Sequence, residues 1–244
     1  MKRTFADLHV RLDLKDAESA QRVLTKVASL GYGLVSVPLT PQTQGEEIVK
    51  LKKICNGLKI DVASRADIAP KTRGQLMHLL RKLRRRFEVI AVVCENKEVA
   101  RQAAKDRRVD LLNFLSNDYR QRFFDWAEAE LASNSLAALE VDLKPLLLLE
   151  GSARIKLLAT LRREISIARE YSVPVVFSSG ADNELLLRKP REAAALVSLM
   201  GIDEATALAM LSSNPSEIVA RNRKKLGHGF VAPGIHAIRE GRDP

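Results

Sequence analysis

The sequence predicts an α/β protein built as a TIM-like parallel (β/α) barrel, with about seven strands and extra helices at its C-terminal end. Segments typical of strands alternate with amphipathic helical segments between residues 4 and 178. From about residue 191 the pattern changes to helices alone. A chain of 244 residues suits one barrel better than two separate domains. We therefore expect a single domain over residues 1–226, followed by a basic, flexible arm over 227–244.

The first half of the chain supplies four expected strands and three helices between them. A strand over 4–11 precedes a helix over 16–30, which Asp16 caps and Gly31 ends. The next strands are predicted at 34–39, 58–68 and 89–94. In these segments the residues are mainly apolar, or alternate between apolar and polar, and glycines and helix caps bound them. The apolar residues of two further segments recur at helical spacing and predict helices over 43–56 and 71–87.

The second half continues the alternation and then ends it. Strands are expected at 110–114, 137–143 and 173–178, with helices at 97–107, 119–131 and 155–171. The only tryptophan, Trp126, lies in the helix over 119–131 and is expected in the core. The last three helices are expected at 191–200, 203–211 and 215–225, separated by glycine or proline stops and new caps.

Three polar side chains converge near the end of the first strand. With a period of two, Asp7, His9 and Arg11 share one face of the strand. The C-terminal ends of barrel strands are where functional sites are built, so this group is a candidate metal or phosphate site. Arg11 cannot ligate a cation and would repel one, which argues against a metal. We therefore expect His9 to act structurally, or to hydrogen-bond to RNA or a neighbouring carboxylate.

Other strands should bring further polar residues to the same rim. Glu140 and Asp142 share one face of the sixth strand, and Arg65 ends the third. A carboxylate pair could do acid–base work or hold a metal, or rim acids and cations could neutralise one another. Ser178 and Ser179, followed by glycine, are suited to contacting a phosphate.

The helix over 71–87 carries only one sign of charge. No acidic residue lies between Asp67 and Glu88. Such a run repels itself unless an anion lies on it, although it can also be a solvated face that aids solubility. The net charge of +10 likewise favours a polyanionic partner. The candidate RNA-binding residues are Arg65, Lys71, Arg73, Arg81, Lys82, Arg84, Arg85, Arg86, Arg188 and Arg191.

Composition and small motifs narrow the function classes. Cys55 and Cys94 are isolated in apolar surroundings, as expected of buried, reduced thiols. The sequence has no dinucleotide-binding glycine turn, phosphate-binding loop, His-Glu-x-x-His or Cys-x-x-Cys. The apolar runs are too short for a signal peptide core or a membrane span, so we expect a soluble, cytoplasmic protein with no membrane partner.

Several short motifs, taken in order, resemble the ribonuclease P protein component 3 family, the thirty-kilodalton subunit type of archaea and eukaryotes. These motifs are FADLH at 5–9, ALEV at 138–141, IAR at 167–169, SSGA at 178–181, LRKPRE at 187–192, residues 196–201 and SNP at 213–215. The family's barrel is similar to that of the polymerase and histidinol phosphatase superfamily of metal-dependent phosphoesterases. Those enzymes open with His-x-His, whereas Arg11 follows His9 here.

The resemblance implies a subunit of ribonuclease P, which removes the 5′ leader from precursor tRNA. The RNA of that enzyme holds the active site, so the implied partners are ribonuclease P RNA, a small partner protein subunit and precursor tRNA within the complex. The chain would then supply no catalytic residue, metal site or cofactor of its own, and Mg²⁺ would be bound by the RNA. The alternative is a stand-alone metal-dependent phosphoesterase that uses Asp7, His9, Glu140 and Asp142 as ligands.

Overall fold

Seven parallel strands form the barrel that the sequence predicts. The computed structural model describes residues 3–40, 45–116, 118–227, 230–232 and 235–236. The strands pair in chain order, each with the next. They are β1 (Phe5–Asp7), β2 (Tyr32–Pro38), β3 (Asp61–Ile68), β4 (Val89–Cys94), β5 (Leu111–Phe114), β6 (Ala138–Asp142) and β7 (Val175–Ser178).

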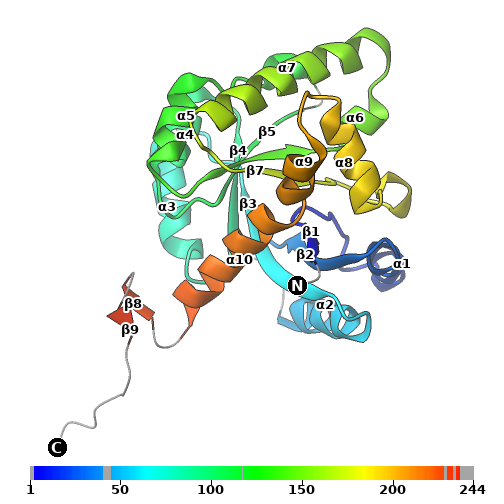
Figure 1. The fold of residues 1–244 in the computed structure, drawn as a ribbon. Coiled ribbons are helices and arrows are strands. Elements are labelled where there is room, and N and C mark those ends of the chain that lie inside the picture. Colours follow the sequence, from blue (N-terminus) through cyan, green and yellow to red (C-terminus); the bar gives the residue numbers. More distant parts are fainter. Residues whose placement is uncertain (1–2, 41–44, 117, 228–229, 233–234, 237–244) are drawn as a thin grey trace, which may run out of the picture.

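Helices surround the strands and form the outer layer (Figure 1). Those that connect strands are α1 (Ala17–Ser29), α2 (Gly45–Gly57), α3 (Arg73–Leu83), α4 (Lys97–Lys105), α5 (Trp126–Ser133), α6 (Lys144–Leu148) and α7 (Gly151–Glu170), with the short 3₁₀ turn η1 (Tyr119–Gln121) before α5. After β7 come η2 (Glu184–Leu186), α8 (Pro190–Ser198), α9 (Glu204–Met210) and α10 (Ser213–Leu226). The expected run of C-terminal helices is therefore confirmed.

The fifth connection differs from the expected single helix over 119–131. A 3₁₀ turn is followed by an irregular segment, in which Phe123 and Phe124 pack edge-on against Phe114 with ring centroids 5.1 and 5.8 Å away. The helix begins only at Trp126, where Asp125 forms a capping box with Glu128. Trp126 is 63% exposed, so its expected place in the core is wrong. The two phenylalanines take that place instead.

The first strand is shorter than expected. It ends at Asp7, its pairing with β2 shifts register between Phe5 and Ala6, and the chain bends at Leu8. Ala6 and Leu8 join the apolar cluster inside the barrel, whereas His9 reaches the polar layer above it. The simple alternation over 4–11 therefore fails at the bend, although it correctly brings His9 and Arg11 together.

In the described part of the chain, β1 and β7 do not pair as strands. Individual hydrogen bonds bridge the gap between them. The backbone N–H of Arg11 donates to the carbonyl of Ala181 at 2.8 Å. The backbone N–H of Ser179 donates to a carboxylate oxygen of Asp7 at 3.0 Å. These two bonds link β1 and the residues after it to the segment that follows β7, and so bridge the gap in the nearly closed barrel.

The helix α10 fills the N-terminal end of the barrel and lies across it in Figure 1. Ile218 and Val219 join an apolar cluster to which each of the seven strands contributes: Ala6, Leu8, Leu34, Ala63, Val89, Ala91, Leu111, Ala138 and Val176. The interior at this end is thus packed with side chains and leaves no channel through the cluster.

Polar groups of α10 hold it against the strands. Asn222 donates to a carboxylate oxygen of Asp110 at 2.8 Å and to the carbonyl of Glu88 at 2.7 Å. The guanidinium of Arg223 pairs with Asp61 and with the side chain of Glu88. Acids at the N-terminal ends of β3, β4 and β5 are therefore neutralised by the helix that closes this end.

The C-terminal arm lies mostly outside the described residues. Two short strands within it, β8 (Phe230–Ala232) and β9 (Ile235–His236), pair antiparallel. Among the described helices, none combines the length and the apolar composition needed to cross a membrane. Cys55 and Cys94 are both free and buried, as expected.

The packing of α10 predicts a large effect of shortening one buried side chain. Ile218→Ala should lower the free energy of unfolding by about 2–5 kcal/mol, because it leaves a cavity among the strands. Glu217→Ala, at an exposed position of the same helix, should change it by about 0.5 kcal/mol or less. Urea unfolding of both variants measures this, and equal effects would show that α10 does not stabilise the barrel.

Candidate functional site

A buried arginine lies at the centre of the polar layer at the C-terminal end of the barrel. Arg65 is fully buried on β3 and donates from both terminal nitrogens to the two carboxylate oxygens of Glu140 on β6, at 2.6 and 2.7 Å. It also donates to Asp67 at 2.6 Å and to the carbonyl of Leu8 at 2.6 Å. Asn113 on β5 donates to the same Glu140 carboxylate at 2.9 Å. This geometry joins strands on opposite sides of the barrel.

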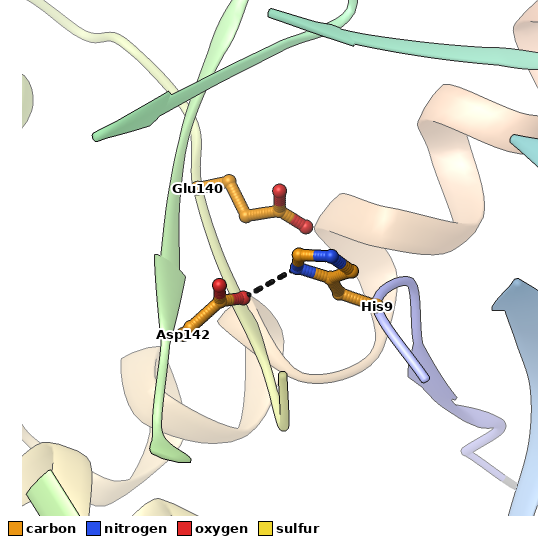
Figure 2. Close-up of side chains that lie close together, drawn as sticks. All are labelled: His9, Glu140 and Asp142. Carbon is orange, nitrogen blue, oxygen red and sulfur yellow. Dashed lines mark hydrogen bonds and ion pairs between the residues drawn. The ribbon is translucent and has the colours of Figure 1, made fainter. Parts of the chain in front are cut away.

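His9 lies between two carboxylates in the same layer. Its Nδ1 is 2.8 Å from Asp142 and its Nε2 is 3.0 Å from Asp67 (Figure 2 shows the first contact). Burial and the Arg65 guanidinium oppose a charge on the ring, but Asp142 and Asp67 outweigh them and raise the pKa of His9 to about 9. His9 is therefore an imidazolium at neutral pH. Its expected hydrogen bond to a neighbouring carboxylate is confirmed.

The carboxylates of this layer are ionised where cations face them. Burial opposes the charge of Asp67, but Arg65 and His9 hold its pKa below the ordinary value. Burial likewise opposes the charge of Asp142, and His9 and Arg65 lower its pKa. Arg11, half exposed at the rim, lies 3.9 Å from the second oxygen of Asp142. Acids and cations of the rim thus neutralise one another.

Asp7 has a different role from its neighbours. One oxygen accepts hydrogen bonds from the backbone N–H groups of His9 and Ser179, at 3.1 and 3.0 Å. Burial raises the pKa of this carboxyl. Gly180 follows with φ +63°, and a Cβ there would lie 2.9 Å from Cγ of Asp142. Only glycine fits this turn, which brings the end of β7 against the first strand.

The two serines at the end of β7, Ser178 and Ser179, do not form the expected phosphate site. Ser178 is buried and donates its hydroxyl to Glu140 at 2.8 Å. Ser179 is also buried, and its hydroxyl accepts from the N–H of Ala181 at 3.1 Å. Both hydroxyls are engaged inside the protein, so an external phosphate cannot reach them. They do belong to the polar cluster, as the sequence predicts.

A cavity of about 300 Å³ opens above this layer. It is lined by Arg11, Asn113, Phe114, Leu115, Ser116, Asp142, Lys144, Pro145, Leu148 and Gly180. Lys144 pairs with Asp182 at the edge. Neither Lys144 nor the role of Asp67 is predicted from the sequence. Asp67 lies two residues after Arg65, on the same face of β3, so the strand alternation could have revealed it.

The basic face of α3 is the second candidate site. Thr72 caps the helix by accepting from the N–H of Gln75 at 3.2 Å, and Leu76, Leu80 and Leu83 are buried. The cations between these leucines therefore point to solvent. Exposed side chains on or beside α3 are Lys71, Arg73, Arg81, Lys82, Arg85 and Arg86. Lys71 pairs with Glu95, whereas Arg81, Lys82 and Arg85 have no ion-pair partner within the described residues.

Two of the arginines expected to bind RNA are engaged inside the fold. Arg65 is fully buried, so RNA cannot reach it. Arg84, 18% exposed, pairs with Asp110 and donates to the carbonyls of Phe87 and Glu88 at 2.9 and 3.0 Å. With a further bond to the carbonyl of Arg108 at 3.1 Å, it satisfies four acceptors and ties the end of α3 to the barrel. Both expectations are corrected: these arginines are structural.

The two arginines near the start of α8 differ from each other. Arg188 is half-buried and donates to the carbonyls of Leu185 and Leu187, at 2.7 and 2.9 Å. Its guanidinium thereby shapes the turn before the helix. Arg191, at the second residue of α8, is exposed and remains a candidate for RNA contact.

The charge of His9 predicts a pH-dependent contribution to stability. Its folded pKa of about 9 lies above its ordinary 6.5, so its charge stabilises the fold fully below pH 6.5 and this effect is lost as the pH rises through 9. At pH 6 the free energy of unfolding of the wild type should be higher than that of His9→Gln by on the order of 3 kcal/mol. At pH 10 this difference should be far smaller. Urea unfolding across this range measures the difference.

His78→Gln, at an exposed position on α3, controls for the loss of an imidazole and should change stability by about 0.5 kcal/mol or less. A His9→Gln difference that stays constant from pH 6 to pH 10 would contradict the assignment of an imidazolium.

Comparison with known proteins agrees with the resemblance in the motifs. The family described as RNase P subunit p30 matches residues 4–226. Ribonuclease P protein component 3 of Methanosarcina acetivorans is 34% identical over 177 residues, which cover 72% of each chain. A chain in the cryo-EM structure of archaeal ribonuclease P with mature tRNA has a TM-score of 0.83 at 21% identity, covering 96% of this chain and 99% of that chain.

Enzymes share the barrel more distantly. A mutant of organophosphorus hydrolase from Deinococcus radiodurans has a TM-score of 0.55 at 12% identity, covering 89% of this chain and 92% of that chain. At such identity the likeness concerns the fold alone. The match over residues 4–226, together with the Methanosarcina relative, decides the family. The chain belongs to the RNase P subunit p30 family.

Proposed function

We propose that this chain is a protein subunit of ribonuclease P, which binds the catalytic RNA and helps it remove the 5′ leader from precursor tRNA. The observation that carries the proposal is the family match over residues 4–226. The chain is then a component of an endoribonuclease holoenzyme and contributes no catalytic residue. Its partners are ribonuclease P RNA, a small protein subunit and precursor tRNA within the complex, all in the cytoplasm.

The barrel rim argues against the alternative of a stand-alone phosphoesterase. Such an enzyme needs carboxylates and imidazoles that are free to bind a metal or a substrate. Here Glu140 is held by Arg65 from both oxygens, and His9 lies between two carboxylates. The Mg²⁺ ions that phosphodiester cleavage uses are bound, in this proposal, by the RNA.

The exposed cations around α3 are the proposed RNA surface. Arg81, Lys82, Arg85 and Arg86 lie within two turns of chain and are exposed. Phosphates of RNA would relieve their mutual repulsion, and each contact would release condensed counterions. Only 5% of residues are aromatic, too few for an extended surface on which bases stack. Binding through phosphates therefore fits this face better than base recognition does.

Reconstitution tests the proposed function. Precursor tRNA cleavage is measured with ribonuclease P RNA and its protein subunits, with this chain present or omitted. Omission should lower the rate or raise the Mg²⁺ concentration required. Equal activity with and without the chain would refute the proposal, and cleavage by the chain alone would favour the phosphoesterase.

Charge reversal on the α3 face tests the RNA surface. The triple variant Arg81→Glu, Arg85→Glu, Arg86→Glu should stay folded, because each exposed position costs about 0.5 kcal/mol or less. Its affinity for the RNA should fall, and the slope of log K against log salt should become shallower by about 1 for each phosphate that the variant no longer neutralises. Filter binding across a salt series and circular dichroism measure these two effects.

A matched control reverses three exposed cations on the opposite side of the barrel, at α1 and just before it (Figure 1). The variant Lys15→Glu, Arg22→Glu, Lys26→Glu changes the net charge by the same amount. If both triple variants lose the same affinity, only the overall charge matters and the α3 face is not the binding surface.

A further inference from the structure

Three side chains at the barrel rim form a donor set that would suit a cation. One ligand atom each from His9, Glu140 and Asp142 lies within 4.8 Å of the others, and the three point toward one another (Figure 2). Imidazole and carboxylate groups are the ligands that zinc and manganese take in proteins. By its ligand types alone, the group resembles a metal site.

A guanidinium already lies among these groups. Four oxygens surround it: both carboxylate oxygens of Glu140 at 2.6 and 2.7 Å, one of Asp67 at 2.6 Å, and the carbonyl of Leu8 at 2.6 Å. The Arg65 side chain is fully buried. We propose that Arg65 is the permanent cation of this centre, that it excludes a metal from the native protein, and that its removal uncovers a latent divalent cation site.

Electrostatics make the two cations mutually exclusive. A metal on Glu140 would have to break the paired bonds from Arg65 and would lie within a few ångströms of its charge, where repulsion in a buried site is strong. The displaced guanidinium, which is fully buried, would lose its carboxylate partners, which is strongly unfavourable. Both ring nitrogens of His9 are already engaged, by Asp142 at 2.8 Å and by Asp67 at 3.0 Å, so neither is free to bind a metal. The donor set therefore does not fit a metal while Arg65 is present.

When Arg65 is removed, the oxygens that it now binds become available as ligands for another cation. Carboxylate and carbonyl oxygens are the ligands of hard divalent cations, and Mn²⁺ also accepts imidazole. Shortening Arg65 to alanine frees the oxygens of Glu140, Asp67 and Leu8 and creates the space that an ion needs. The resulting cluster of negative charge lacks its cation, so the variant should be unstable until a metal binds.

A second buried arginine provides a matched control. Arg122 is buried and pairs with the fully buried Glu164 through two nitrogens, at 2.8 and 2.6 Å from one oxygen. Its other partners are the carbonyl of Phe114 and the hydroxyl of Ser116, at 2.9 and 2.6 Å. This centre offers one carboxylate and no imidazole, so Arg122→Ala should be destabilised without gaining a metal site.

The experiment measures melting temperature and Mn²⁺ binding of four proteins. These are wild type, Arg65→Ala, Arg122→Ala, and the double variant Arg65→Ala with Glu140→Gln. Without metal, Arg65→Ala should melt about 10 °C or more below wild type. Added Mn²⁺ should raise its melting temperature progressively as the ion binds the folded state. Electron paramagnetic resonance should detect stoichiometric Mn²⁺ on Arg65→Ala alone.

Each outcome of the experiment either supports or overturns the proposal of a latent cation site. Wild type that binds Mn²⁺ stoichiometrically overturns the proposal, as does an Arg65→Ala protein that Mn²⁺ stabilises no more than it stabilises Arg122→Ala or the double variant. If Arg65→Ala is unfolded without metal, the yield of folded protein on refolding from urea with Mn²⁺ becomes the readout, and no gain in yield also overturns it. RNA binding by the α3 face is unaffected by either result.

Discussion

The ion pair between Arg65 and Glu140 is the interaction on which the upper half of the barrel depends. The two residues lie on β3 and β6, strands separated by two others in the sheet, and both are fully buried. Removing one partner of such a pair leaves an uncompensated charge away from water and costs about 3–5 kcal/mol. The carbonyl of Leu8 and the amide of Asn113 bond to the same pair, so β5 and the bend that follows β1 are fixed by it as well.

The two ends of the barrel are closed by different chemistry. At the N-terminal end, α10 inserts Ile218 and Val219 among apolar residues of all seven strands. At the C-terminal end the interior is filled by charged groups that satisfy one another. A TIM-barrel enzyme keeps its C-terminal end open to substrate, with reactive groups exposed there. Here those groups bond to one another inside the protein instead.

Local patterns in the sequence predict the barrel and the exposed part of the basic helix. The leucines of α3 recur at helical spacing, so the exposure of Arg81, Lys82 and Arg85 follows from their place between them. Arg84 lies four residues after Leu80, on the buried side of the helix, so the same spacing could have separated it from them, although it does not reveal its partner Asp110, which lies 26 residues further along the chain. Arg65 is similar, since the alternation of β3 places it inside the barrel but does not reveal that Glu140 lies opposite. The bend at Leu8 and the exposure of Trp126 likewise depend on tertiary packing.

Whether the charge of an arginine is neutralised within the fold depends on the carboxylates that contact it. Arg65, Arg84 and Arg122 each have a buried or nearly buried carboxylate partner, so their charges are neutralised within the fold. The net charge of +10 therefore cannot reside there and must lie on exposed positions such as those of α3. A polyanion would gain little from the barrel interior and much from this face, because only unpaired surface cations release counterions when phosphates bind. Burial with acids thus makes an arginine part of the scaffold, and exposure without them leaves its charge available to a polyanion.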